Sequence, residues 1–106
     1  MNKPTRFYSN RQEKAVAKIL GGKRQSNSGA TAFYKGDIIT DNFLIEAKTK
    51  IGACKSFTIQ KEWLEKIAEE AFAMNKQYNA LVFDFGDNST RYYVIDEKTF
   101  IKLTEE

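Results

Sequence analysis

A long amphipathic segment separates two short apolar ones in the second half of the chain. Residues 59–77 place their apolar side chains largely along one helical face, whereas residues 43–49 and 80–85 have the length and character of buried strands. Strands joined through a helix can lie parallel in one sheet, because parallel neighbours need a crossover connection. This order predicts an α/β fold with a mixed central β-sheet flanked by helices. The helical face consists of Trp63, Leu64, Ile67, Ala71, Phe72 and Met74.

Another helix is expected earlier in the chain, over residues 10–20, where an apolar stripe recurs at helical spacing. Asn10 is its expected cap, Glu13 follows three residues later as in a capping box, and two glycines come directly after the segment. For the long helix of residues 59–77, Thr58 is the expected cap.

The rest of the chain is expected to contain the strands and a short terminal helix. Asp96 is expected to cap a short terminal helix that carries Phe100, Ile101 and Leu103. The order of elements is then α-β-β-α-β-β-α, within a single domain spanning residues 1–106. Strands are expected at 36–40, 43–49, 80–85 and 91–95, with a further short strand near 31–35.

Composition places the chain among globular domains. Apolar residues make up 42% and charged residues 29% of its 106 residues, unlike a disordered tail. No apolar run approaches the roughly 18 residues of a membrane span, and the first ten residues lack the apolar core of a signal peptide. The single cysteine, Cys54, excludes an internal disulfide and fits a reducing compartment. We therefore expect a cytoplasmic protein.

Histidine is absent from the sequence. Its absence excludes Ser-His-Asp and Cys-His catalysis, nucleases of the HNH type, and zinc sites of the usual Cys/His kind. Any catalysis must therefore use carboxylates, lysines, hydroxyls, or a hard cation bound by oxygen ligands.

Charge is distributed unevenly along the chain. Residues 1–61 contain 12 basic and four acidic side chains, a net charge of +8, whereas residues 62–106 carry a net charge of −5. Such asymmetry favours a polyanionic partner, most simply nucleic acid. An uneven, fully solvated surface is the alternative explanation.

The segment KGDIITDNFLIEAKTK places two acidic side chains where they repel each other. A two-residue turn at Asp41 and Asn42 sets a hairpin register in which Asp37 lies opposite Glu46. Directly opposed side chains lie about 5 Å apart, and like charges there are destabilising. A divalent cation between the carboxylates removes this repulsion, and Mg²⁺ suits two carboxylates plus water. Lys48, two residues beyond Glu46, is expected on the same face of its strand.

With these residues in this order, the chain resembles the PD-(D/E)XK nuclease superfamily, and within it the archaeal-type Holliday junction resolvases and their phage relatives. The resemblance implies a restriction-endonuclease-like core. One departure is Gly36, where the superfamily frequently has a proline that takes no part in the chemistry. The matching features are a helix bearing Glu13, a loop with Arg24 and Ser28-Gly29, Lys35-Gly36-Asp37-Ile38, Ile45-Glu46-Ala47-Lys48, the long helix, and the strand Leu81–Phe85.

An active site on the hairpin and the first helix is what this resemblance implies. Asp37, Glu46 and Glu13 would bind Mg²⁺, for which Mn²⁺ is an expected substitute, and the backbone carbonyl of Ala47 is a further expected ligand. The cation would polarise the scissile phosphate and activate water. Lys48 would orient or deprotonate that water and stabilise the developing charge. Capping the helix is the alternative role for Glu13.

Contacts between loop residues and DNA phosphates are also implied. Such contacts bind the backbone without reading base sequence, so selection by DNA shape is expected. At the head of the long helix, Gln60 either aligns water or phosphate or simply begins the helix. The expected DNA-binding residues are Lys23, Arg24, Ser28, Lys35, Lys50, Lys55 and Gln60.

The expected function is thus Mg²⁺-dependent hydrolysis of phosphodiester bonds in four-way or branched DNA. A phage-type nicking or single-strand-specific nuclease and a non-catalytic DNA-binding module of the same fold are the alternatives. Two symmetric cuts across a junction need two active sites, so a homodimer is expected; a phage-encoded enzyme would act in the host cytoplasm. Trp63 is assigned to the core or a dimer interface. Asp84 is assigned to an exposed strand position, with hydrogen bonding to the proposed site residues as its alternative role.

Overall fold

The computed structural model describes residues 5–24, 38–48, 54–86 and 90–105. None of the helices in these ranges is long and apolar enough to cross a membrane. The described elements are α1 Thr5–Leu20, β1 Lys23–Arg24, β2 Ile38–Ile39, β3 Phe43–Lys48, α2 Lys61–Ala73, β4 Tyr78–Phe83, β5 Tyr92–Val94 and α3 Glu97–Thr104.

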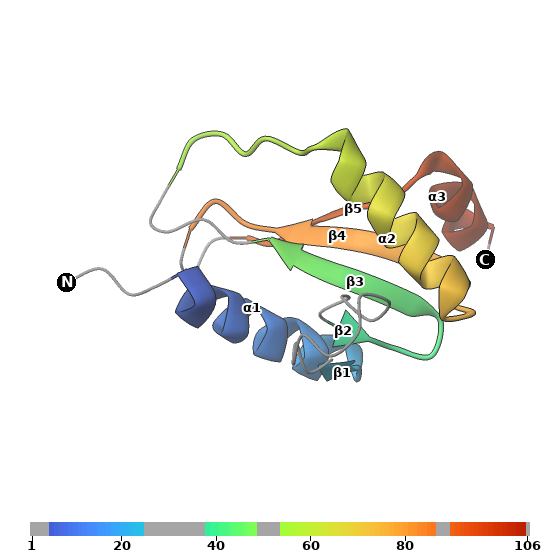
Figure 1. Ribbon diagram of the computed structural model, residues 1–106, viewed down its shortest axis with the longest axis horizontal. Helices are drawn as coiled ribbons and strands as arrows, with labels where there is room; N and C mark the ends of the chain where they lie inside the picture. The colour runs from blue at the N-terminus through green and yellow to red at the C-terminus, as the bar shows by residue number, and fades with distance from the viewer. Residues whose placement is uncertain (1–4, 25–37, 49–53, 87–89, 106) are drawn as a thin grey trace.

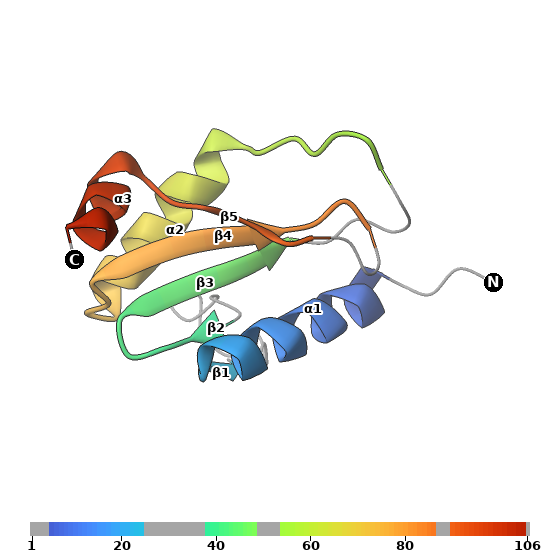
Figure 2. The ribbon, with the colours of Figure 1, turned by 180° about the vertical axis from the view of Figure 1, so that it is seen from behind.

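The strands form one mixed sheet in the order β1-β2-β3-β4-β5. β3 and β4 run parallel, whereas the other neighbouring strands run antiparallel. α2 makes the crossover between the two parallel strands, as the amphipathic segment predicts. α1 covers one face of the sheet and α2 the other (Figures 1 and 2). The expected α/β class, with a mixed sheet flanked by helices, is confirmed.

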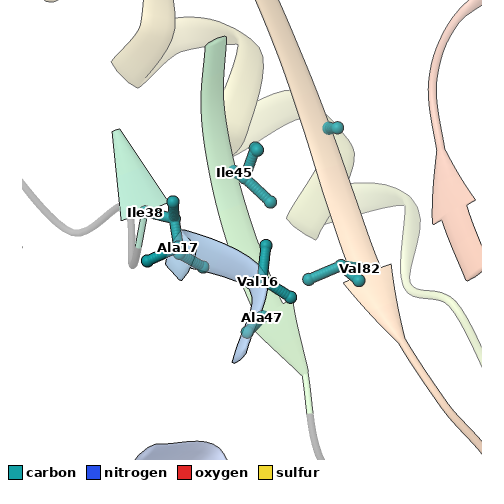
Figure 3. Packing of buried hydrophobic residues seen from close by; sticks show 7 residues of the cluster. Val16, Ala17, Ile38, Ile45, Ala47 and Val82 are labelled. Atoms are coloured by element: carbon teal, nitrogen blue, oxygen red, sulfur yellow. The ribbon is translucent and has the colours of Figure 1, made fainter. Parts of the chain in front are cut away.

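Alternation along the strands divides the apolar side chains between two cores. On the α1 face, Val16 of the helix packs with Ile45 of β3 and Val82 of β4 (Figure 3). On the α2 face, Ile67 of the helix packs with Leu81 of β4. All five side chains are at most 2% exposed. Burying each contributes roughly 1.5–3 kcal/mol to folding, so the two helices are held to the sheet mainly by apolar contact.

The β2–β3 hairpin has the predicted two-residue turn. The amide of Thr40 donates to the carbonyl of Phe43 at 3.0 Å, and the amide of Phe43 donates to the Thr40 hydroxyl at 2.9 Å. Ile38 lies opposite Ile45, as predicted. The next pair in the predicted register includes Asp37, which lies outside the described residues, so that pairing stays a prediction.

The first helix begins earlier than predicted. α1 starts at Thr5, so Asn10 lies within the helix and its predicted capping role is wrong. A polar residue caps a helix only where the chain before it leaves the helical conformation, and here the preceding turn is helical as well. The capping-box interpretation of Glu13 is wrong for the same reason. The predicted end is confirmed, because Gly21 follows the helix with a φ of +67°.

The second helix is shorter than predicted at both ends. Gln60, not Thr58, is its N-cap residue, and the Gln60 side chain makes no capping hydrogen bond. At the other end Asn75 has a φ of 58°, a left-handed conformation that stops the helix and that asparagine tolerates. Phe72 is 85% exposed, so its predicted place on the buried face is wrong.

The C-terminal helix is capped as predicted. Asp96 Oδ1 accepts a hydrogen bond from the amide of Thr99 at 2.7 Å. This hydrogen bond holds the pKa of the Asp96 carboxyl below its usual value. Of the α3 side chains, however, only Thr99 is buried. The apolar residues Phe100 and Ile101 are 58% and 49% exposed.

The strands differ from prediction mainly at their ends. β4 begins two residues early, at Tyr78, and ends at Phe83, and β5 occupies the middle of the predicted 91–95 segment. Residues 23 and 24, predicted as loop, form the short strand β1 and pair with β2. The short strand expected near 31–35 lies outside the described residues.

Candidate active site at the ends of the parallel strands

The proposed catalytic residues of β3 lie near the edge of the sheet where the two parallel strands end. Glu46 is opposite Leu81 of β4, and Lys48 is opposite Phe83, the last residue of that strand. Because side chains alternate along a strand, both β3 residues project from the face that α2 covers. The carboxyl ends of parallel strands are the usual place for ligand sites in α/β proteins.

Glu46 and Lys48 form a partly buried ion pair. The Lys48 Nζ lies 3.4 Å from Glu46 Oε2, and the two side chains are 30% and 14% exposed. A partly buried charged group needs a partner, and each of these two side chains supplies one to the other. The sequence predicted that these two side chains share a face, and the geometry confirms it.

Trp63 is the second partner of the lysine. The Lys48 Nζ lies 4.3 Å from the centroid of the Trp63 ring, a cation–π contact. Phe57 packs edge-on against the Trp63 indole and stacks on Phe83, so further aromatic side chains support the Trp63 ring. The ammonium group therefore lies between a carboxylate and an aromatic face. The sequence assigned Trp63 only to the core or an interface, and no local pattern links a helical tryptophan to a lysine 15 residues earlier.

Asp84 has a different environment from the one predicted. It follows β4 directly, is half-buried, and accepts two hydrogen bonds rather than lying exposed on the strand. The Gln12 side chain donates to Asp84 Oδ2 at 3.3 Å, and the amide of Gly86 donates to Oδ1 at 3.1 Å. Gln12 itself is 5% exposed. This contact fixes α1 against the same edge at which β3 and β4 end.

Glu13 stands next to Gln12 in α1, the helix that covers the opposite face of the sheet from Glu46 and Lys48. Its role as a metal ligand stays a prediction. Ala47 is buried on the α1 face, 7% exposed.

The expected DNA-binding residues fall in several parts of the molecule. Lys55 and Gln60 are exposed in the segment that leads into α2. Lys23 and Arg24 form β1, at the outer edge of the sheet. The structure therefore distributes these four positions over two regions. Asp37, Ser28, Lys35 and Lys50 lie outside the described residues.

A hard divalent cation takes oxygen ligands, and carboxylates are the usual ones. Glu46 offers such a carboxylate, only partly exposed and already facing a positive charge. The described part of the chain has no group of three or more His, Cys, Asp or Glu side chains that could hold a metal ion. Glu46 by itself is therefore not enough for a cation site. It fits one only together with the expected ligand Asp37.

Comparison with protein-family models, with curated proteins and with solved structures finds no match for this chain. Its function must therefore be inferred from its own residues and their geometry.

Proposed function

We propose that this chain is a Mg²⁺-dependent endonuclease of the PD-(D/E)XK type that hydrolyses phosphodiester bonds in branched DNA, as a Holliday junction resolvase does. The pairing of Glu46 with Lys48 carries the proposal. These residues share one face of β3 near the carboxyl end of a parallel strand pair, and they are separated by one residue. The β2–β3 register next to them is the one used to predict Asp37 opposite Glu46.

Each residue then has a distinct role. Glu46 and Asp37 would hold the divalent cation, which would polarise the phosphate and activate a water molecule when bound. Lys48 offers an ammonium group to a phosphate oxygen and stabilises the negative charge that develops there. Trp63 limits the directions in which that ammonium can point, because the ring lies 4.3 Å away. A fixed donor loses less entropy on reaching the transition state than a free lysine does.

A cleavage assay tests this proposal most directly. A labelled four-way junction, a flap and a linear duplex are incubated with the protein, with Mg²⁺ and with EDTA. We expect cutting that needs the cation and prefers the junction. Equal cutting of all three substrates contradicts the resolvase assignment but keeps the nuclease assignment.

Two substitutions locate the activity. Glu46→Gln and Lys48→Met should each reduce the cleavage rate by about a hundredfold or more, which is typical for loss of a group acting on the transition state. Binding to the junction in Ca²⁺ should persist in Glu46→Gln and weaken only slightly in Lys48→Met, which removes one of several phosphate contacts. Glu65→Gln and Lys66→Met are matched controls on the exposed side of α2 and should cut normally.

The outcomes separate the candidate functions. A site variant that cuts at the wild-type rate contradicts the site assignment. If the wild-type protein binds junctions tightly but never cuts any substrate with Mg²⁺ or Mn²⁺, the non-catalytic binding module is correct instead.

A further inference from the structure

A row of side chains crosses the sheet at the level of Lys48. Lys48 of β3 is paired in register with Phe83 of β4, and Phe83 is paired with Tyr92 of β5. Because directly paired residues point to the same side of a sheet, all three side chains lie on the face that α2 covers. Two strand spacings separate Lys48 from Tyr92, about 10 Å. The row therefore connects the proposed catalytic lysine with the outer strand of the sheet.

Tyr92 is the open end of this row. Its ring stacks on the Phe83 ring, with centroids 5.8 Å apart and planes at 28°, and Phe85 contacts it edge-on at 5.7 Å. Phe83 is itself covered, because Phe57 stacks on it at 4.6 Å and leaves it 9% exposed. Tyr92 is 48% exposed. Two aromatic neighbours thus hold in place a ring that is open to a ligand.

The segment that covers the row is basic. Residues 54–61 lead into α2 on the α2 side of the sheet (Figures 1 and 2) and contain two lysines and no acidic residue. Both lysines, Lys55 and Lys61, are exposed. The amide of Cys54 donates to the carbonyl of Phe85 at 2.8 Å, which ties this segment to the chain just beyond β4. Positive charge and an open aromatic ring therefore belong to the same part of the molecule.

A nucleotide has the two properties that this surface can recognise. Its base presents an aromatic face to the ring of Tyr92, and its phosphate is anionic and suits the lysines, the combination that binds single strands. An apolar peptide would cover the ring but would leave the lysines without anionic partners. The base must be unpaired, because in a duplex both of its faces are covered by neighbouring bases. The separation of about 10 Å from Lys48 corresponds to about three steps of a DNA strand at 3.4 Å per nucleotide.

We infer that Tyr92 is a stacking site for an unpaired DNA base, about three nucleotides from the phosphate that is cut. The distance to the cut rests on the proposed function, because it is counted from Lys48, whereas the stacking itself does not. Every base has a face that can stack, so the site selects unpaired DNA without reading sequence. It favours DNA that has open bases beside the cut, as at the centre of a branched molecule, over continuous duplex.

Binding of a short labelled oligothymidylate in EDTA tests the stacking. Tyr92→Ala should raise its dissociation constant by about fivefold to a hundredfold, the usual effect of losing one base–aromatic stack. Tyr92→Phe keeps the ring and should bind within about twofold of the wild type. Tyr93→Ala is the matched control and should bind normally, because Tyr93 is the next residue, is 42% exposed and points to the opposite face.

An abasic oligomer of the same length separates stacking from charge. It has the same phosphates but no bases, so the wild type and Tyr92→Ala should bind it equally. The inference would be overturned if Tyr92→Ala weakened binding of both oligomers alike, or if Tyr93→Ala lost as much affinity as Tyr92→Ala. Wild-type protein that binds the thymidylate no more tightly than the abasic oligomer would overturn it as well.

Photo-cross-linking places the base without any substitution, so it remains decisive even if Tyr92→Ala unfolds. An oligothymidylate with one iododeoxyuridine is irradiated with the wild-type protein in EDTA, and the linked peptide is identified by mass spectrometry. The cross-link should map to Tyr92, and cross-links at other residues alone contradict the site. Since both assays exclude divalent metal, their failure leaves the proposed cleavage untouched. A chain that stacks the base but never cuts contradicts only the proposed function.

Discussion

At the scale of single residues, the contact between Lys48 and Trp63 gives a graded test. Trp63→Leu removes the aromatic face while keeping an apolar side chain, and Trp63→Phe keeps a weaker face. An exposed cation–π contact is worth about 0.5–1 kcal/mol, so the single-turnover cleavage rate should fall by about two- to fivefold in the leucine variant and less in the phenylalanine variant. Junction affinity in Ca²⁺ should not change.

Phe57→Leu is the control for this series. It removes the aromatic ring that packs against Trp63 and leaves both Lys48 and the indole unchanged. Urea unfolding of all three variants separates lost stability from lost positioning. A Trp63→Leu protein that cuts at the wild-type rate, or a Phe57→Leu protein that loses as much activity, would show that the indole has no effect on the lysine beyond packing.

The sequence predicted one of these two contacts and missed the other. Glu46 and Lys48 lie on one strand, and a period of two places them on one face whatever surrounds them. Trp63 reaches the lysine only because α2 packs on that face at a particular rotation. This rotation depends on how the side chains of α2 and of the sheet interdigitate. The apolar pattern of a helix determines the rotation only approximately. Phe72 shows the same uncertainty, because it follows the apolar stripe and yet is exposed.

At the scale of elements, the end of α1 depends on two glycines with different tasks. Gly21 has a φ of +67°, and a Cβ there would meet nothing within 4 Å. Alanine at this position should cost about 1–2 kcal/mol, the penalty of the left-handed conformation. At Gly22 a Cβ would lie 2.8 Å from the carbonyl oxygen of Ile39. Gly22→Ala should cost more, because backbone of β2 must move. Urea denaturation measures both, and an equal or smaller loss at Gly22 would contradict the close approach of helix and strand.

The cap of α3 should respond to acid. The hydrogen bond from Thr99 lowers the pKa of Asp96 in the folded protein. The carboxylate therefore stabilises α3 fully above its ordinary pKa of 3.8, and this contribution is lost as the pH falls through the lowered folded value. The protection factors of the α3 amides, which correct hydrogen exchange for its intrinsic pH dependence, should therefore fall over that interval in the wild type.

Asp96→Asn keeps a capping side chain that does not titrate, so its α3 amides should lose this acid response. Asp96→Ala should weaken the helix by about 1 kcal/mol at neutral pH, and by progressively less as acid protonates the wild-type carboxylate. An unchanged response in the asparagine variant would assign the acid sensitivity to another group.

Apart from β1, which was predicted as loop, the element types were predictable, but their ends were not. The parallel pair followed from one amphipathic segment between two apolar ones, and the hairpin register from the Asp41-Asn42 turn. The start of α1 was missed because Asn10 is suited to a cap and equally compatible with an extra helical turn. Only the packing of the preceding residues decides between the two, and that is a tertiary effect.

At the scale of the whole molecule, the net charge of +8 in residues 1–61 predicts how DNA binding depends on salt. Each phosphate neutralised on duplex DNA contributes about −0.9 to the slope of log affinity against log salt. Lys23→Ala with Arg24→Ala should flatten this slope by about one to two units and weaken binding to all sequences equally. The measurement is a salt titration in Ca²⁺ with two junctions of unrelated arm sequence.

Lys66→Ala with Lys98→Ala is the matched control, since both lysines are exposed in the acidic half of the chain. Its slope should equal that of the wild type. An unchanged slope in the β1 variant would show that this edge does not touch DNA. A large difference between the two junctions would show that the protein reads bases and not shape.

The parallel pairing of β3 and β4 also determines when the proposed site can assemble during synthesis of the chain. β2 and β3 are joined by a tight turn and can pair as soon as both have left the ribosome. β3 cannot pair with β4 until all of α2 has emerged and its long loop has closed, which loses chain entropy before contacts are gained. Glu46 and Lys48 come from one side of that crossover, and Trp63 from within it. A nascent chain therefore exposes Glu46 and Lys48 early, but the proposed site cannot assemble until most of the chain has been translated. A chain that ends before α2 lacks the Trp63 ring that contacts Lys48.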